Sequence, residues 1–158
     1  METIKFLCFS LLCLMALSAN AQYVDLGLPS GTKWKTYNES GLYTYNAAVS
    51  RFDKSLPSKA QWEELATECE WSWTRGSCKV TGPNGQSITL PAAGYRRCKD
   101  GQVSDDVNGV YNSPLYWSST PFDPHDGWSY YIDATAAFPH VSWFGQCSQL
   151  SVRLVQEK

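Results

Sequence analysis

The spacing of apolar residues divides the chain into two helical segments and several extended ones. Between residues 44 and 52, apolar side chains recur at intervals of three and four residues, which predicts a short helix. A stronger helix is predicted over residues 58–70, because Ser58 and Gln61 match a capping box directly after Pro57. The apolar positions of this helix form one stripe, made of Trp62, Leu65, Ala66 and Cys69.

Other segments alternate apolar and polar residues, which is typical of strands with one buried face. Two hairpins are predicted, one around residues 29–31 near the start of the chain and one around Gly82-Pro83-Asn84-Gly85. Further strands are predicted at residues 71–74, 115–119, 129–133 and 150–155, and residues 96–112 are expected to form a long surface loop. This order of elements predicts an α+β fold, with the helices packed on one side of a mostly antiparallel sheet.

Residues 1–21 have the pattern of a removable leader. Lys5 precedes an apolar run over residues 6–17 that is too short to cross a bilayer, and small residues precede Gln22 as a signal peptidase requires. The cleavage site has no cysteine that could be acylated. We therefore expect a signal peptide over residues 1–21, a single exported domain over residues 22–158, in the periplasm, at the cell surface or secreted, and no transmembrane segment.

Composition narrows the class of partner. The formal net charge is −2, so the chain lacks the excess of basic residues that nucleic-acid binding needs, and nucleic acid is excluded as a partner. Aromatic residues make up 14% of the chain and charged residues only 18%, which excludes an intrinsically disordered protein. The oligomeric state is left open.

Four cysteines remain after the leader: Cys69, Cys78, Cys98 and Cys147. An even number of cysteines in an exported domain predicts disulfides, and three pairings are open. We expect at least one bridge, with Cys69 involved because it ends the buried stripe of the main helix. A zinc site is disfavoured, since no two of these cysteines have a C-x-x-C spacing and the chain has only two histidines.

Seven phrases of the chain are more specific than its composition. They are residues 23–34 (YVDLGLPSGTKW), 56–65 (LPSKAQWEEL), 69–74 (CEWSWT), 79–85 (KVTGPNG), 90–96 (LPAAGYR), 116–120 (YWSST) and 151–155 (SVRLV). In this order and spacing they resemble the Fibrobacter succinogenes major paralogous domain family of exported bacterial proteins, which is similar to a branch of the C-type-lectin-like fold. The resemblance implies two helices packed on a twisted, mostly antiparallel sheet with long irregular loops.

The resemblance carries no catalytic residues. Related C-type-lectin-like proteins bind sugars through calcium with Glu-Pro-Asn or Gln-Pro-Asp triplets, and the chain has neither. No cofactor is therefore expected, and calcium is kept as an alternative with Asp105, Asp106 and Asn108 as its candidate ligands, although turn-forming contacts explain these residues equally well. The formylglycine-generating enzymes, which resemble this fold and use paired cysteines, keep an enzyme open as an alternative.

The sequence lacks the common catalytic patterns. His125 and His140 are the only side chains with a pKa near neutrality, and both lie in segments that read as exposed loops. No nucleophile-elbow, zinc-protease or phosphate-loop motif is present. No catalytic residue is assigned, and the alternatives to a binding protein are an extracellular enzyme acting on polysaccharide or thiols and a structural surface module.

The late aromatic residues are the candidate binding site. Residues 121–146 combine aromatic and histidine side chains with turn-forming residues and fall mostly between the family phrases. The ligand-binding candidates are Phe122, His125, Trp128, Tyr131, Phe138, His140, Trp143 and Phe144. Rigid aromatic side chains on such loops suit the stacking of sugar rings or the filling of protein pockets. The sequence thus favours a non-enzymatic, exported recognition domain that binds a glycan or a cell-surface protein, while packing in the core is the alternative for about half of these residues.

Overall fold

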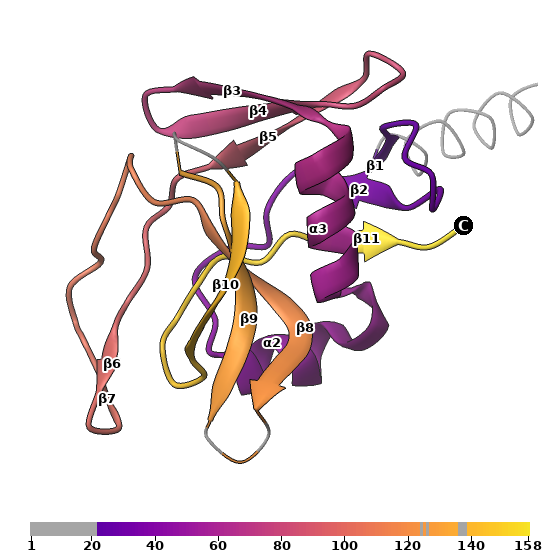
Figure 1. The fold of residues 1–158 in the computed structure, drawn as a ribbon. Coiled ribbons are helices and arrows are strands. Elements are labelled where there is room, and N and C mark those ends of the chain that lie inside the picture. The colour runs from indigo at the N-terminus through magenta and orange to yellow at the C-terminus, as the bar shows by residue number, and fades with distance from the viewer. Residues whose placement is uncertain (1–21, 124, 126, 136–138) are drawn as a thin grey trace, which may run out of the picture.

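A computed structural model describes residues 22–123, 125, 127–135 and 139–158 of the chain. Two helices pack against antiparallel sheets, which confirms the expected α+β class (Figure 1). The helices are α2 (Tyr45–Phe52) and α3 (Lys59–Glu68), joined by the 3-10 turn η1 (Asp53–Ser55). The strands are β1 (Tyr23–Asp25), β2 (Lys33–Lys35), β3 (Glu70–Thr74), β4 (Ser77–Thr81), β5 (Ser87–Pro91), β6 (Cys98–Lys99), β7 (Gln102–Val103), β8 (Leu115–Asp123), β9 (Trp128–Asp133), β10 (His140–Gly145) and β11 (Val155–Gln156).

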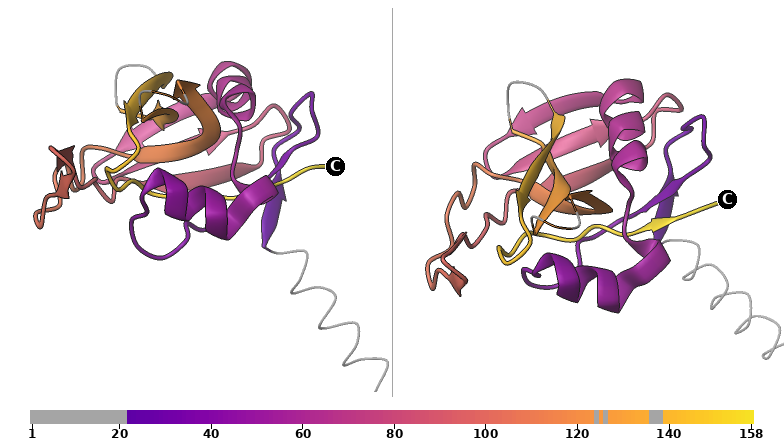
Figure 2. Two further views of the ribbon diagram at one scale, coloured as in Figure 1. Left: turned by 90° about the horizontal axis from the view of Figure 1, so that it is seen from below. Right: turned by 60° about the horizontal axis from the view of Figure 1, so that its bottom comes forward.

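The strands form three small three-stranded sheets and one short hairpin. The sheet orders are β1-β2-β11, β3-β4-β5 and β10-β9-β8, and β6 pairs with β7. Helix α3 lies between the β8–β10 sheet and the sheet that holds both ends of the described chain, as the views in Figures 1 and 2 agree. The ring centroids of Trp34 on β2 and Trp62 on α3 are 4.6 Å apart, so this helix is fixed to the terminal sheet by direct aromatic contact.

Both helices begin where the sequence predicts. Thr44 accepts a hydrogen bond from the backbone N–H of Ala47 and caps α2. Ser58 and Gln61 form the predicted capping box at the start of α3, which satisfies two backbone N–H groups reciprocally. The stripe of α3 is buried at Trp62 and Leu65, as its spacing predicts.

The buried residues form two apolar clusters. The first joins α3 to the hairpin of β4 and β5, with Trp34, Trp62 and Tyr116 at its centre. The second lies under α2, where Trp117 and Tyr45 meet edge to face at 5.7 Å. The tryptophans of the family phrases therefore pack mainly in the interior, as expected from the sequence.

Three predicted elements differ from the structure. Residues 150–155 form a strand only at β11, because Leu150 and Ser151 make single bridges, to Tyr43 and Tyr116, instead of a continuous ladder. The loop over residues 96–112 contains the short hairpin of β6 and β7. Strand β10 was not predicted, because its aromatic residues Trp143 and Phe144 are adjacent and lie on opposite faces of the sheet.

Candidate functional site

A group of three aromatic side chains, two of them exposed, lies on β8, β9 and β10. Phe122 stacks on Trp143 with their ring centroids 5.0 Å apart and their planes 16° from parallel. Tyr130 meets Phe122 edge to face at 5.4 Å. Trp143 is 52% exposed and Phe122 44% exposed, although both rings are large and apolar. We refer to Phe122, Tyr130 and Trp143 as the aromatic patch.

The backbone explains why these side chains meet. Trp143 on β10 and Tyr130 on β9 are directly paired across the two strands, so their side chains share a face of the sheet. Further along the same face, Ile132 and Val141 pack into the first core cluster. Strands β9 and β10 thus extend past the apolar core, and the face that carries Ile132 and Val141 in the core carries aromatic side chains where it leaves the core.

A lysine borders the aromatic patch. The Lys59 ammonium lies 4.9 Å from the ring centroid of Tyr130 and forms an ion pair with Glu63 at 3.1 Å. The hydrogen bond and charge of the Glu63 carboxylate raise the pKa of Lys59, so this group stays cationic at neutral pH. The backbone N–H of Lys59 also donates to the Thr120 hydroxyl, which fixes the first residue of α3 to β8.

The predicted binding residues divide into several groups. Phe122 and Trp143 lie in the aromatic patch. His125 is exposed in the turn between β8 and β9, where its backbone N–H donates to Asp123. His140 is exposed at the start of β10, directly opposite Asp133. Phe138 lies outside the described residues.

Tyr131 and Phe144 lie on the other face of the sheet. Tyr131 is only 8% exposed, and burial raises its pKa. Phe144 is half-buried, and its ring meets Tyr131 at 5.6 Å and Tyr95 at 5.7 Å. Both side chains pack with the second core cluster, so the structure assigns them to the interior and not to an exposed binding face.

Trp128 lies at the edge of a different hollow. It is 42% exposed and, with Phe144, lines a small cavity beside Cys98 and Cys147. Its strand partner is Gly145, which has no side chain to cover it. Trp128 is therefore accessible, but it is not among the rings in contact within the aromatic patch.

Sequence reasoning missed two members of this site. Tyr130 alternates with Ile132, and this pattern favours packing in the core, but only Ile132 belongs to the first core cluster, whereas Tyr130 is half-buried beside Lys59. No pattern in the sequence distinguishes Lys59 from the other residues of the predicted helix. A cation at the first turn of a helix that follows a proline is a weak signal, and only the contact between α3 and β9 gives it a role.

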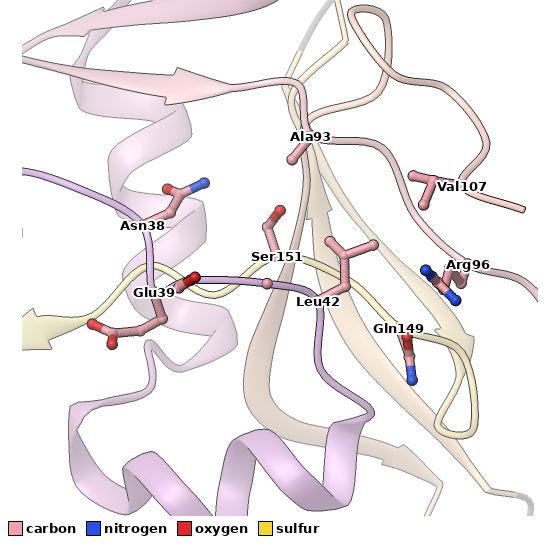
Figure 3. A pocket seen from close by; sticks show the side chains of 10 residues that line it. Asn38, Glu39, Leu42, Ala93, Arg96, Val107, Gln149 and Ser151 are labelled. Atoms are coloured by element: carbon pink, nitrogen blue, oxygen red, sulfur yellow. The ribbon is translucent and has the colours of Figure 1, made fainter. Parts of the chain in front are cut away.

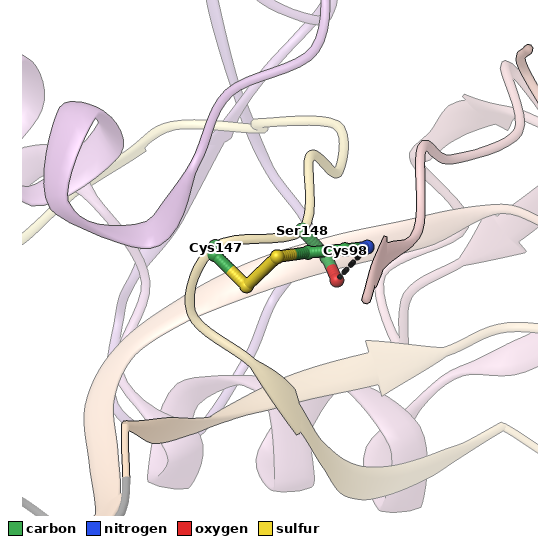
Figure 4. Close-up of a disulfide and its surroundings, with 3 residues drawn as sticks. All are labelled: Cys98, Cys147 and Ser148. Atoms are coloured by element: carbon green, nitrogen blue, oxygen red, sulfur yellow. Dashed lines mark hydrogen bonds between the residues drawn. A yellow bond between two sulfur atoms is a disulfide. The ribbon is translucent and has the colours of Figure 1, made fainter. Parts of the chain in front are cut away.

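Among the described residues, one disulfide joins Cys98 to Cys147, with their Cα atoms 5.6 Å apart (Figure 4). The expectation of at least one bridge is confirmed, but the expected participation of Cys69 is wrong. Cys69 and Cys78 are free thiols that pack with the first core cluster. Burial raises the pKa of each to about 11, so both are protonated and unreactive near neutral pH.

The candidate calcium ligands lie in an exposed loop. Asp105, Asp106 and Asn108 are all exposed. The backbone N–H of Asp106 donates to the Ser104 hydroxyl, and Asn108 forms a backbone bridge with Tyr95. Within the part of the chain that the structure describes, no three His, Cys, Asp or Glu side chains converge as metal ligands would. Turn formation and the bridge to Tyr95 account for the geometry of this loop.

No helix among the described residues is long and apolar enough to cross a membrane. Comparison of the chain with protein-family models, with curated proteins and with solved structures found no match.

Proposed function

We propose that this protein is an exported recognition domain of the C-type-lectin-like type, related to the Fibrobacter succinogenes major paralogous domain family, and that it binds a glycan through the aromatic patch. The observation that carries the proposal is the stacked pair of Phe122 and Trp143, which is exposed although it belongs to a rigid three-stranded sheet. An exposed apolar cluster on a small domain is a candidate for a binding surface. The disulfide between Cys98 and Cys147 agrees with an oxidising compartment and hence with export.

A glycan fits this surface better than an apolar ligand that needs a deep pocket. The rings of the aromatic patch lie on an open surface, and the flat apolar faces of pyranose rings can pack on aromatic rings. The Lys59 ammonium at its edge, next to Tyr130, provides donors for ring hydroxyl groups. Because the rings are held by strand pairing, little side-chain entropy is lost when a ligand binds.

Loss-of-function variants on a glycan array test the proposal. Trp143→Ala removes one half of the stacked pair from an exposed position, so the fold is preserved, and binding to any glycan recognised by the wild type is expected to fall about tenfold or more. Tyr37→Ala is the matched control, because Tyr37 is 76% exposed and lies outside the patch. Equal binding by the wild type and Trp143→Ala would refute the patch as the site. Retention of a cell-surface protein, with no glycan bound, would identify the alternative ligand class.

A further inference from the structure

A second hollow lies apart from the aromatic patch, between three segments that are distant in the sequence. The segment of residues 38–42, the segment from Ala93 to Arg96 and the segment from Gln149 to Ser151 border a cavity of about 620 Å³ (Figure 3). This volume lies in the range of small-molecule sites. We refer to it as the Arg96 cavity, since Arg96 is the residue on which its chemistry depends.

A buried positive charge lies behind this cavity. Arg153 is fully buried, and its guanidinium donates to the backbone carbonyls of Lys35, Thr36 and Thr89 and to the side-chain oxygen of Asn38, which itself lines the cavity. All four acceptors are neutral, and no carboxylate pairs with Arg153 among the described residues. The hydrogen bonds satisfy its donors but leave its charge uncompensated, in a region of low dielectric where the field extends further than in water.

A second cation faces the cavity directly. The side chain of Arg96 lines one end of it, beside Gln149, and makes no hydrogen bond or ion pair to any residue the structure describes. The only carboxylate in the lining, Glu39, lies at the opposite end in Figure 3 and is paired with Lys35. The end of the cavity near Arg96 therefore has an unpaired guanidinium and no carboxylate in its lining.

An anionic group is the expected partner of Arg96, and the rest of the lining indicates the kind of molecule that carries it. Leu42, Ala93 and Val107 supply apolar contact, while the Ser40 and Ser151 hydroxyls have no hydrogen-bond partner in the described part of the chain. An amino acid or peptide end would bring an ammonium group, and the lining offers no free carboxylate to receive it. A ligand with one carboxylate, several hydroxyls and no basic group matches these features.

The wall that carries Arg96 is held rigidly. Arg96 and Gln149 exchange two backbone hydrogen bonds of 2.9 Å. Two residues away on each strand, the disulfide joins Cys98 to Cys147, and the backbone N–H of Cys98 donates to the Ser148 hydroxyl (Figure 4). Preorganisation of this kind reduces the entropy cost of binding.

From this geometry we infer that the Arg96 cavity is a binding site for an acidic sugar, whose carboxylate pairs with Arg96 and whose hydroxyls bind the polar lining. The site is separate from the aromatic patch and does not depend on the function proposed for that patch.

Titration with methyl glucuronide, observed by protein NMR, tests the inference, with methyl glucoside as the neutral counterpart. The acidic sugar is expected to shift the amide signals of residues around Arg96 and Gln149, and the neutral sugar is expected to bind at least about tenfold more weakly, since a charge-assisted hydrogen bond is lost. Equal shifts from the two sugars, or no shift from the acidic sugar at roughly 10 mM, a concentration that detects millimolar affinity, would overturn it.

Four variants locate the site. Arg96→Gln removes the charge but keeps a polar side chain with hydrogen-bond donors, and it is expected to weaken glucuronide binding about tenfold or more. Arg97→Gln makes the same change of charge at the neighbouring exposed residue, which does not line the cavity, and is expected to change binding less than about twofold at physiological salt. Val107→Trp fills the cavity from an exposed loop position and is expected to abolish binding. If Arg96→Gln and Arg97→Gln weaken binding equally, the effect is one of general charge and the site is wrong. Trp143→Ala should leave glucuronide binding unchanged. Weaker glucuronide binding by this variant would place the sugar on the aromatic patch instead.

Discussion

Removal of the disulfide should destabilise the domain by an amount that follows from the length of the loop it closes. Cys98 and Cys147 are separated by 49 positions. The chain-entropy relation for a loop of this length gives about 14 cal/mol/K, or about 4 kcal/mol at 25 °C, as the cost of losing the cross-link. For a domain of this size, that loss corresponds to a fall in Tm of roughly 10–15 °C.

The loss of stability can be measured by urea unfolding followed by tryptophan fluorescence. The wild type is compared with the double variant Cys98→Ala/Cys147→Ala. Reductant is the matched control: it should lower the stability of the wild type toward that of the variant and leave the variant unchanged, because Cys69 and Cys78 are already free thiols. A loss below about 1 kcal/mol would refute the entropic argument. Peptide mapping that found Cys69 or Cys78 bridged would refute the connectivity.

Two further outcomes follow from buried groups. Burial raises the pKa of Tyr116 to about 12 and that of the Cys78 thiol to about 11, both above their values in the unfolded chain. The free energy of unfolding should therefore keep its full value below about pH 9 and fall as the pH rises from 9 to 12. Thermal melts across this range measure the change, and a flat profile would contradict the burial of these groups. Gly82→Ala should destabilise the domain by about 2 kcal/mol or more, because a Cβ at this position would lie 2.0 Å from the backbone carbonyl oxygen of Leu26, whereas Gly145→Ala, which meets nothing within 4 Å, should leave the melting temperature within about 2 °C of the wild type.

Local signals were sufficient for much of the fold. The capping box at Ser58 defines the start of α3, and the turn at residues 82–85 defines the hairpin of β4 and β5. In each case the information lies within a few neighbouring residues. Strand β10 could not be predicted because its aromatic residues Trp143 and Phe144 are adjacent and lie on opposite faces of the sheet, so the sequence shows no period of two.

The candidate site depended on contacts that are distant in the sequence. The disulfide joins an irregular loop to a turn 49 positions later, and no local pattern favours it over a bridge at Cys69. Tyr131 and Trp143 look equivalent as aromatic residues of a late segment, but the register of β9 and β10 directs one inward and the other outward. That no opposite charge accompanies Arg153 is apparent only when its four acceptors, from two other parts of the chain, are seen to be neutral.

The terminal sheet has a practical consequence for attaching this domain to other structures. In the order β1-β2-β11, the first and last strands both pair with β2, so the chain enters and leaves the fold through the same small sheet. No residue of these three strands belongs to the aromatic patch or lines the Arg96 cavity. A fluorescent tag, a bead or a neighbouring module joined at Lys158 can therefore tether the molecule with both proposed ligand surfaces left open, which makes the same orientation suitable for display and for sensors.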